Sequence, residues 1–201
     1  MARKKPRRFP RPLGHRPYRK MFVLATEGEK TEPQYFAILN NANSVVHINC
    51  IRCKHESAPA QVLKRMESFL KEKGLKASDE AWLVIDKDEW QEEQLAVLYD
   101  WSLRKDNYGL ALSNPKFEYW LLLHFEEGNG IGSGEACNRR LTYYLPNYDK
   151  GINKSDISEA QIHEAIERAR RRDNPPCTDW PRSTGTTVYR LVESIIRVEG
   201  E

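Results

Sequence analysis

The sequence predicts an α/β fold, with a mostly parallel central sheet and helices on both of its faces. Four short segments rich in apolar residues, at positions 21–26, 44–53, 81–85 and 109–112, are each followed by a segment with helical spacing. Three of them are continuous apolar runs bounded by turn or acidic residues, which is typical of buried parallel strands. The alternation of strands and helices favours a sheet covered on both faces. A chain of 201 residues is long enough for one such domain with a sizeable core.

The first predicted strand, residues 21–26, leads into a short helix. Thr31 is placed to cap this helix, and Pro33 suits its first turn. The apolar side of the helix is formed by Tyr35, Phe36, Ile38 and Leu39.

The second predicted strand, residues 44–53, precedes a longer helix. This helix begins at Ser57 or Pro59 and runs to about Lys73, because apolar side chains recur along it every three or four positions. Gly74 ends it, as glycine commonly ends helices.

The third and fourth predicted strands, residues 81–85 and 109–112, complete the alternation. A helix over residues 91–104 joins them, and a short helix over residues 117–125 follows the fourth strand. The aromatic residues of this region, together with His124, are most simply explained as core residues.

The last third of the chain is predicted to be a loop followed by helices. Residues 126–134 contain four glycines but follow a helix and lack the Gly-Lys-Ser/Thr ending of a phosphate loop, so we interpret them as a flexible loop. Ser155 or Ser158 caps a helix that ends at Arg172. Residues 186–198 form a final amphipathic helix.

These elements divide the chain into an arm, residues 1–20, an α/β core, residues 21–134, and a helical extension packed on that core, residues 135–201. The arm holds nine of the 32 Lys and Arg residues and no acidic residue, which leaves 23 basic against 29 acidic residues in the remainder. A basic, proline-containing arm without apolar periodicity does not fold alone.

Two interpretations of the arm stay open. It either attracts nucleic-acid phosphates or acts as a solubilising tail that lies on its own acidic body. In the first case we expect phosphate contacts from the basic residues nearest the N-terminus: Arg3, Lys4, Lys5, Arg7 and Arg8.

Neither the arm nor the remainder indicates export or membrane insertion. The N-terminal segment has no apolar region of the kind found in secretory signals. No stretch approaches 18 consecutive apolar residues. On this evidence we expect a cytoplasmic protein without a membrane span.

Cysteine spacing raises the possibility of a zinc site. Cys50 and Cys53 have the CxxC spacing of zinc ligands, with His47 and His55 beside them. No second closely spaced pair follows, and Cys50 lies in an apolar run. We therefore interpret this segment as a strand with free thiols, not as a zinc site.

Acidic residues follow three of the predicted strands. Glu27 comes directly after the first, Asp86 and Asp88 after the third, and Glu118 shortly after the fourth. Because the carboxyl ends of parallel strands meet at one edge, where α/β proteins bind ligands, these carboxylates are expected to converge. Asp86 and Asp88 are two positions apart and point the same way in an extended segment.

Such a cluster indicates a site for a hard divalent cation. Two carboxylates about 4 Å apart repel by roughly 4 kcal/mol at an effective dielectric near 20. Oxygen-only ligands favour Mg²⁺ or Mn²⁺ over zinc, so we predict Glu27, Asp86, Asp88 and, least securely, Glu118 as ligands. Glu118 also suits the first turn of a helix, and an isolated Asp-x-Asp suits a solvated loop.

This arrangement is the minimum apparatus for cleaving a phosphodiester. Water would be activated by the metal and by Glu27 as a general base, and Lys30 would meet the charge of the transition state. We therefore predict Glu27, Lys30, Asp86 and Asp88 as catalytic residues. Lys30 is equally plausible as a surface residue in an ion pair.

The motifs, in their order, resemble those of the RloB-like proteins of prokaryotic defence and restriction–modification loci. They are residues 27–32 (EGEKTE), 85–88 (IDKD) and 113–120 (SNPKFEYW), followed by His124 and Phe125. The resemblance covers about residues 21–125 and fades toward the C-terminus.

The resemblance implies a Toprim-like fold, in which a strand-end glutamate and an Asp-x-Asp motif hold Mg²⁺. Matched by position, Glu27 is the acid/base or ligand, and Asp86 and Asp88 are ligands. The resemblance also implies a Mg²⁺-dependent nuclease of antiphage defence, acting on RNA or DNA beside an ATPase of the ABC or AAA type. Residues 183–188 (STGTTV) depart from the family's Asn-Pro-Ser-Thr pattern.

A rival hypothesis is a regulatory or nucleic-acid-binding subunit that partners such an ATPase and does not cleave. The acidic body and basic arm suit a binding module as well as an enzyme. The sequence does not distinguish a DNA substrate from an RNA substrate, or one metal ion from two. It also does not give the trigger of activity or the oligomeric state.

Overall fold

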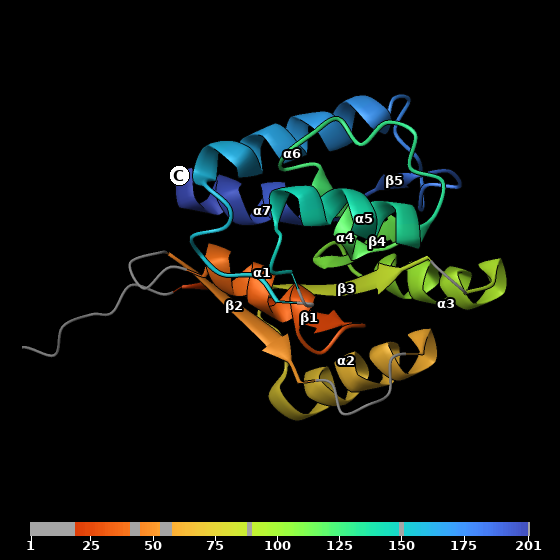
Figure 1. Ribbon diagram of the computed structural model, residues 1–201. Coiled ribbons are helices and arrows are strands. Elements are labelled where there is room, and N and C mark those ends of the chain that lie inside the picture. The colour runs from red at the N-terminus through yellow and green to blue at the C-terminus, as the bar shows by residue number, and fades with distance from the viewer. Residues whose placement is uncertain (1–18, 41–44, 53–57, 88–89, 149–150, 201) are drawn as a thin grey trace, which may run out of the picture.

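The computed structural model describes residues 19–40, 45–52, 58–87, 90–148 and 151–200. It has an α/β fold built on one five-stranded sheet, in the order β2-β1-β3-β4-β5 (Figure 1). The first four strands are parallel, and β5 runs antiparallel to β4 at one edge. The strands are β1 (Lys20–Thr26), β2 (Val46–Ile51), β3 (Glu80–Asp86), β4 (Tyr108–Asn114) and β5 (Gly185–Thr186). The predicted fold class is therefore confirmed.

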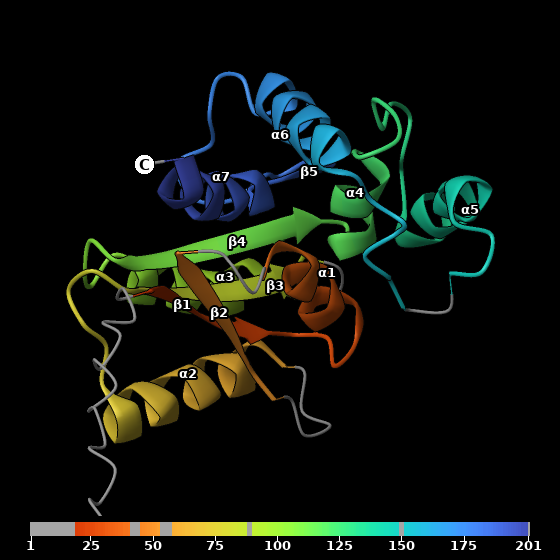
Figure 2. The same ribbon diagram turned by 90° about the vertical axis from the view of Figure 1, so that its left-hand side faces the viewer.

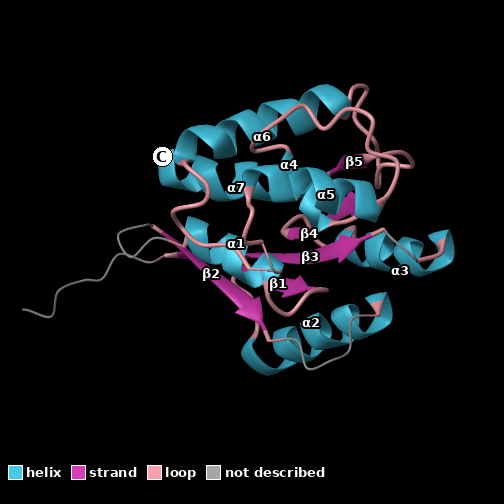
Figure 3. Ribbon diagram, in the orientation of Figure 1, coloured by secondary structure: helices cyan, strands magenta, loops and turns pink. Residues whose placement is uncertain are grey.

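Helices cover both faces of the sheet, as Figures 2 and 3 show. They are α1 (Thr31–Leu39), α2 (Pro59–Lys73), α3 (Glu92–Ser102), α4 (Phe117–Leu122), α5 (Gly134–Tyr144), α6 (Glu159–Arg172) and α7 (Val188–Gly200). Among the described residues, none of these helices has the length and apolar character needed to cross a bilayer.

Two hydrophobic clusters form, one on each face, because neighbouring side chains of a strand point to opposite sides. In β1, Val23 and Ala25 pack with α2 and α3, whereas Phe22 and Leu24 pack with α1 and the C-terminal helices. All four side chains are fully buried. This two-sided burial explains why the strand is a continuous apolar run.

Several local predictions agree with the structure, and one does not. Helix α2 spans Pro59–Lys73, and Gly74 follows it at φ 71°. Ser158 caps α6 by accepting a hydrogen bond from the Gln161 N–H. Thr31 does not cap α1, because it is the first helical residue and its hydroxyl lies 3.3 Å from that of Tyr148.

The chain ends differ in detail from the prediction. Lys20, assigned above to the arm, is the first residue of β1, and its ammonium lies 2.7 Å from the Glu80 carboxylate. The last helix begins at Val188, because the preceding residues 185–186 form β5. Thr187 then donates its backbone N–H to the Leu112 carbonyl at 2.8 Å. Residues 1–18 of the predicted arm, residues 1–20, lie outside the described residues, and the division into arm, core and extension stays a prediction.

A buried polar pair lies inside the core between α1 and α4. His124 is 2 % exposed, and its Nδ1 lies 3.0 Å from the Trp120 carbonyl. Because Nδ1–H donates to that carbonyl, Nε2 accepts from the Tyr35 hydroxyl at 3.2 Å. Burial lowers the pKa of His124 to about 4, so this histidine is a neutral core residue, as its aromatic surroundings suggest.

We expect Gly109→Ala to lower the free energy of unfolding by about 1–3 kcal/mol, as overpacking does. Gly109 pairs with Trp82 across β3 and β4, and a Cβ at this position would lie 2.6 Å from Cζ3 of the indole. Urea unfolding measures the change. Gly132→Ala is the matched control, since nothing lies within 4 Å of its added Cβ. Equal stability of Gly109→Ala and wild type would contradict the packing of Trp82.

Stability should fall as the pH falls from about 6.5 toward 4, by roughly 3 kcal/mol from His124 alone. The unfolded chain takes up a proton at His124 near pH 6.5, whereas the folded chain does so only near pH 4. Urea unfolding across this range should show a shallower decline for His124→Asn, which keeps a donor and an acceptor. His163→Gln changes an exposed histidine and should follow wild type. An unchanged pH dependence in His124→Asn would contradict this assignment.

Candidate functional site

Three neighbouring parallel strands end at the same edge of the sheet. Thr26 of β1 pairs with Val84 of β3, and Asp86 at the end of β3 pairs with Ser113 of β4. Figure 2 shows β1 and β4 pointing toward this side, where α4 begins. The acidic residues that follow the strands are thereby placed at one edge.

Glu27 lies across the end of β3. Its Oε2 accepts a hydrogen bond from the backbone N–H of Asp86 at 3.1 Å, and its Oε1 accepts one from the Trp90 indole at 3.1 Å. Its own backbone N–H continues the sheet by donating to the Val84 carbonyl at 3.0 Å. The half-buried carboxylate is therefore held in one orientation beside Asp86.

Asp86 is the centre of the acidic cluster. Its Oδ1 accepts a hydrogen bond from the backbone N–H of Phe117, the first residue of α4, at 2.8 Å. Burial and the charges of Glu32, Glu27 and Glu118 raise the pKa of Asp86 well above its usual value. Four carboxylates therefore interact at this edge.

Glu32 was not among the predicted ligands. It lies in the first turn of α1, is 4 % exposed, and accepts a hydrogen bond from the Gly28 N–H at 3.0 Å. A side chain at position 28 would collide with this carboxylate, so the glycine allows the close approach. In the sequence, the signal for this contact is that Gly28 and Glu32 stand four positions apart within the EGEKTE motif.

Glu118 is buried in the first turn of α4, with 6 % of its surface exposed. Its Oε1 accepts a hydrogen bond from the Tyr148 hydroxyl at 2.9 Å, and its Oε2 lies 3.7 Å from the Lys116 ammonium. Tyr148 also contacts the Thr31 hydroxyl at 3.3 Å. Lys116 and Tyr148 are thus further residues of the site that the sequence reasoning missed.

The structure brings together only part of the predicted set. Glu27, Asp86 and Glu118 meet at the edge of the sheet, whereas Lys30 is exposed at the start of α1. Asp88 and the basic residues Arg3, Lys4, Lys5, Arg7 and Arg8 lie outside the described residues.

The cysteine segment keeps its structural interpretation where it is described. Cys50 is a half-buried free thiol in β2, and burial raises its pKa to about 12. Cys53 and His55 lie outside the described residues.

The donors at the acidic edge fit a hard divalent cation by their chemistry, because all are carboxylate oxygens. Burial first, and the charges of Glu32, Glu27 and Glu118 next, raise the pKa of Asp86, as expected where carboxylates lie near one another. Within the described ranges, however, no three Asp, Glu, His or Cys side chains are grouped closely enough to hold a metal ion. Asp88, the remaining predicted ligand, is outside those ranges.

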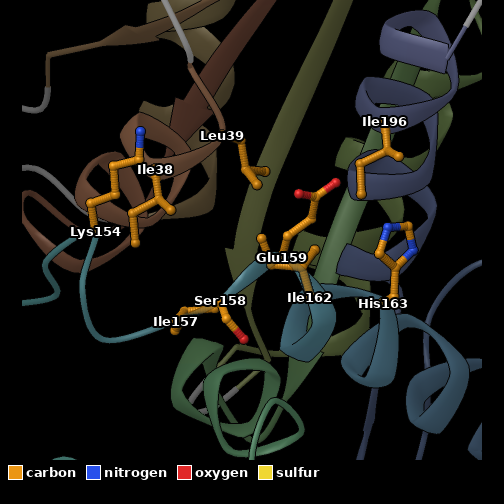
Figure 4. A pocket seen from close by; sticks show the side chains of 9 residues that line it. All are labelled: Ile38, Leu39, Lys154, Ile157, Ser158, Glu159, Ile162, His163 and Ile196. Atoms are coloured by element: carbon orange, nitrogen blue, oxygen red, sulfur yellow. The ribbon is translucent and has the colours of Figure 1, made fainter.

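A separate pocket of about 440 Å³ lies between the C-terminal end of α1, the start of α6 and α7 (Figure 4). Its lining is mixed, because isoleucine and leucine side chains alternate with Lys154, Ser158, Glu159 and His163, and Lys154 and His163 stand on opposite sides of it. None of the carboxylates of the acidic edge lines this pocket; these are Glu27, Glu32, Asp86 and Glu118. We place the candidate site at the acidic edge, because the acidic residues that follow the strands are found there and not at this pocket.

Comparison with protein families gives one match. The family model of the RloB-like protein matches residues 22–195, which include β1 from Phe22 onward, the other four strands in full and most of α7. The comparisons with curated proteins and with solved structures gave no match. Since the family model covers most of the chain, the protein belongs to the RloB-like family.

Proposed function

We propose that this protein is a Mg²⁺- or Mn²⁺-dependent nuclease that cleaves RNA or DNA in prokaryotic antiphage defence. The observation that carries this proposal is the position of Glu27, Asp86 and Glu118 at the carboxyl edge of the sheet, where Glu27 accepts from the Asp86 N–H and Asp86 accepts from the Phe117 N–H, next to Glu118. Membership in the RloB-like family supports the setting in defence. The Toprim-like character of the site belongs to the same proposal.

The roles follow from the contacts of each residue. Asp86 and Glu118, with Asp88, would hold the cation, which supplies Lewis-acid chemistry at the phosphate when bound. Glu27 is the general base, because two hydrogen bonds orient its carboxylate at the edge of the cluster. Lys116, whose ammonium is 3.7 Å from Glu118, would offset charge on the phosphate, and exposed Lys30 would approach from solvent.

A non-catalytic regulatory subunit is the second candidate function. The observation that favours it is the lack, within the described ranges, of three metal-binding side chains already grouped together. In this role the protein would bind nucleic acid and partner a defence ATPase of the ABC or AAA type. The two candidates differ in whether the acidic edge binds a cation and turns over substrate.

Glu27→Gln and Asp86→Asn should each reduce cleavage of RNA or DNA by at least about 100-fold, since each removes a charge that acts in the transition state. Gel-based cleavage of tRNA, single-stranded DNA and duplex DNA with Mg²⁺ or Mn²⁺ measures the reduction. Glu93→Gln is the control, because Glu93 is an exposed carboxylate on α3 outside the acidic cluster.

Titration calorimetry with Mn²⁺ separates the two candidate functions. The nuclease requires Mn²⁺ binding that Asp86→Asn weakens and Glu93→Gln leaves unchanged. Wild-type protein that binds nucleic acid but neither Mn²⁺ nor Mg²⁺ would favour the regulatory subunit. Cleavage of equal rate in Glu27→Gln, Asp86→Asn and wild type would remove these residues from the mechanism.

Deleting residues 1–18 should flatten the salt dependence of nucleic-acid binding. For every phosphate that the arm neutralises, the deletion reduces the slope of log K against log[salt] by about 0.9 on duplex DNA and about 0.7 on single strands. Filter binding across a salt series measures the slope. The deletion leaves Lys20 in place, because Lys20 starts β1 and pairs with Glu80. An unchanged slope would exclude a role of the arm at phosphates.

A further inference from the structure

Helix α5 presents an aromatic side chain to solvent. Cys137 and Leu141 are fully buried on its inner side, whereas Tyr143 is 87 % exposed. Among the large hydrophobic side chains in the described part of the chain, Tyr143 is the most exposed. Nothing in the fold of the described residues accounts for this exposure.

The two other tyrosines of this region are already engaged in packing. Tyr144 stacks on Phe125, with ring centroids 5.1 Å apart and planes 10° apart, and its hydroxyl donates to Glu126 at 3.3 Å. Tyr148 donates to Glu118. Tyr143 differs from both because its ring is open to a ligand.

Arg139 lies on the same side of α5 as Tyr143. Arg139 is exposed and precedes Tyr143 by four residues, a spacing that places two side chains next to each other on a helix. No carboxylate of the described residues forms an ion pair with Arg139, whereas Arg140 pairs with Glu126. Glu135 precedes Arg139 by four residues on the same helix but forms no ion pair with it. An aromatic face beside such a guanidinium suits a stacked base and its phosphate.

The chain connects this surface to the acidic edge at both ends of α5. Figure 2 shows α5 beyond the carboxyl end of β4, on the far side of α4. At the start of α5, Gly134 lies against the Lys116 side chain, and a Cβ there would be 3.2 Å from its Cδ. At the other end Tyr148 contacts Glu118, and the five residues from Tyr143 to Tyr148 span at most about 17 Å.

We propose that Tyr143 and Arg139 form a platform for an unpaired nucleic-acid base. The base stacks on the Tyr143 ring, and the Arg139 guanidinium contacts the neighbouring phosphate. The platform thereby selects single-stranded or unpaired segments and holds them near the acidic edge. This inference rests on the proposed function, because it names the substrate class for that site.

Binding of short labelled oligonucleotides tests the platform without cleavage. Fluorescence anisotropy in EDTA compares single strands of RNA and DNA with the matched duplex. Tyr143→Ala should weaken single-strand binding about tenfold or more, while duplex binding changes little. Tyr143→Phe should bind like wild type, because it keeps the π-face.

Two further variants separate stacking from charge and from general surface effects. Arg139→Gln should lower the slope of log K against log[salt] for single strands by about 0.7, whereas Tyr143→Ala should leave that slope unchanged. Leu103→Ala is the matched control, since Leu103 is 64 % exposed at the end of α3. It should leave single-strand binding unaltered.

The outcomes distinguish the platform from the nuclease. Single-strand binding that needs Tyr143, without any Glu27-dependent cleavage, would keep the platform and overturn the nuclease. Cleavage that needs Glu27, with equal single-strand binding by Tyr143→Ala and wild type, would overturn the platform alone. The platform is also overturned if wild type binds no single strand, or if Tyr143→Ala alters the oligomeric state and not the affinity.

Discussion

Repulsion among carboxylates at the carboxyl edge of the sheet is the constraint around which this part of the molecule is built. Parallel pairing of β1, β3 and β4 brings Glu27 and Asp86 to one place, and the helices that follow add Glu32 and Glu118. Two carboxylates held about 4 Å apart would repel by roughly 4 kcal/mol at an effective dielectric near 20, and less at larger separations. The fold offsets part of this cost by giving each carboxylate a hydrogen-bond donor. These donors are the backbone N–H groups of Gly28, Asp86 and Phe117 and the hydroxyl of Tyr148.

How far the sequence predicts this arrangement depends on how many positions separate the two residues of each contact along the chain. The strands were predictable because burial on both faces requires continuous apolar runs, and their parallel order then implied that Glu27 and Asp86 meet. Contacts of Tyr148 with Thr31 and Glu118 were not predictable, since they join residues 117 and 30 positions apart. Strand β5 was missed for a different reason. Its two residues are too few for a pattern, and they form a strand only by pairing with Ser113 and Asn114 of β4, far earlier in the chain.

The C-terminal third is part of the sheet and of the acidic edge, as well as a helical cover. Strand β5 pairs with the end of β4, and the hydroxyl of Thr186 lies 2.8 Å from that of Ser113. Tyr148, in the segment after α5, donates a hydrogen bond from its hydroxyl to Glu118. The family match extends through residue 195, so it includes these contacts. Changes in α5 or β5 can therefore reach the site through Tyr148 and Ser113 without altering an acidic residue.

The charge at the acidic edge also sets the requirements for binding a polyanion. Lys87, next to Asp86, does not neutralise it, because its ammonium lies 3.2 Å from the Trp90 carbonyl and 3.5 Å from Glu92. Lys116 pairs with Glu118, which leaves the four carboxylates in excess over nearby cations. A phosphate approaching this edge is therefore repelled until cations are supplied from elsewhere. In the proposed nuclease, a divalent ion at the edge and cations around it, such as the proposed contact from Arg139, would meet that need. The acidic edge would then provide the chemistry, and binding of nucleic acid would depend on the residues that surround it.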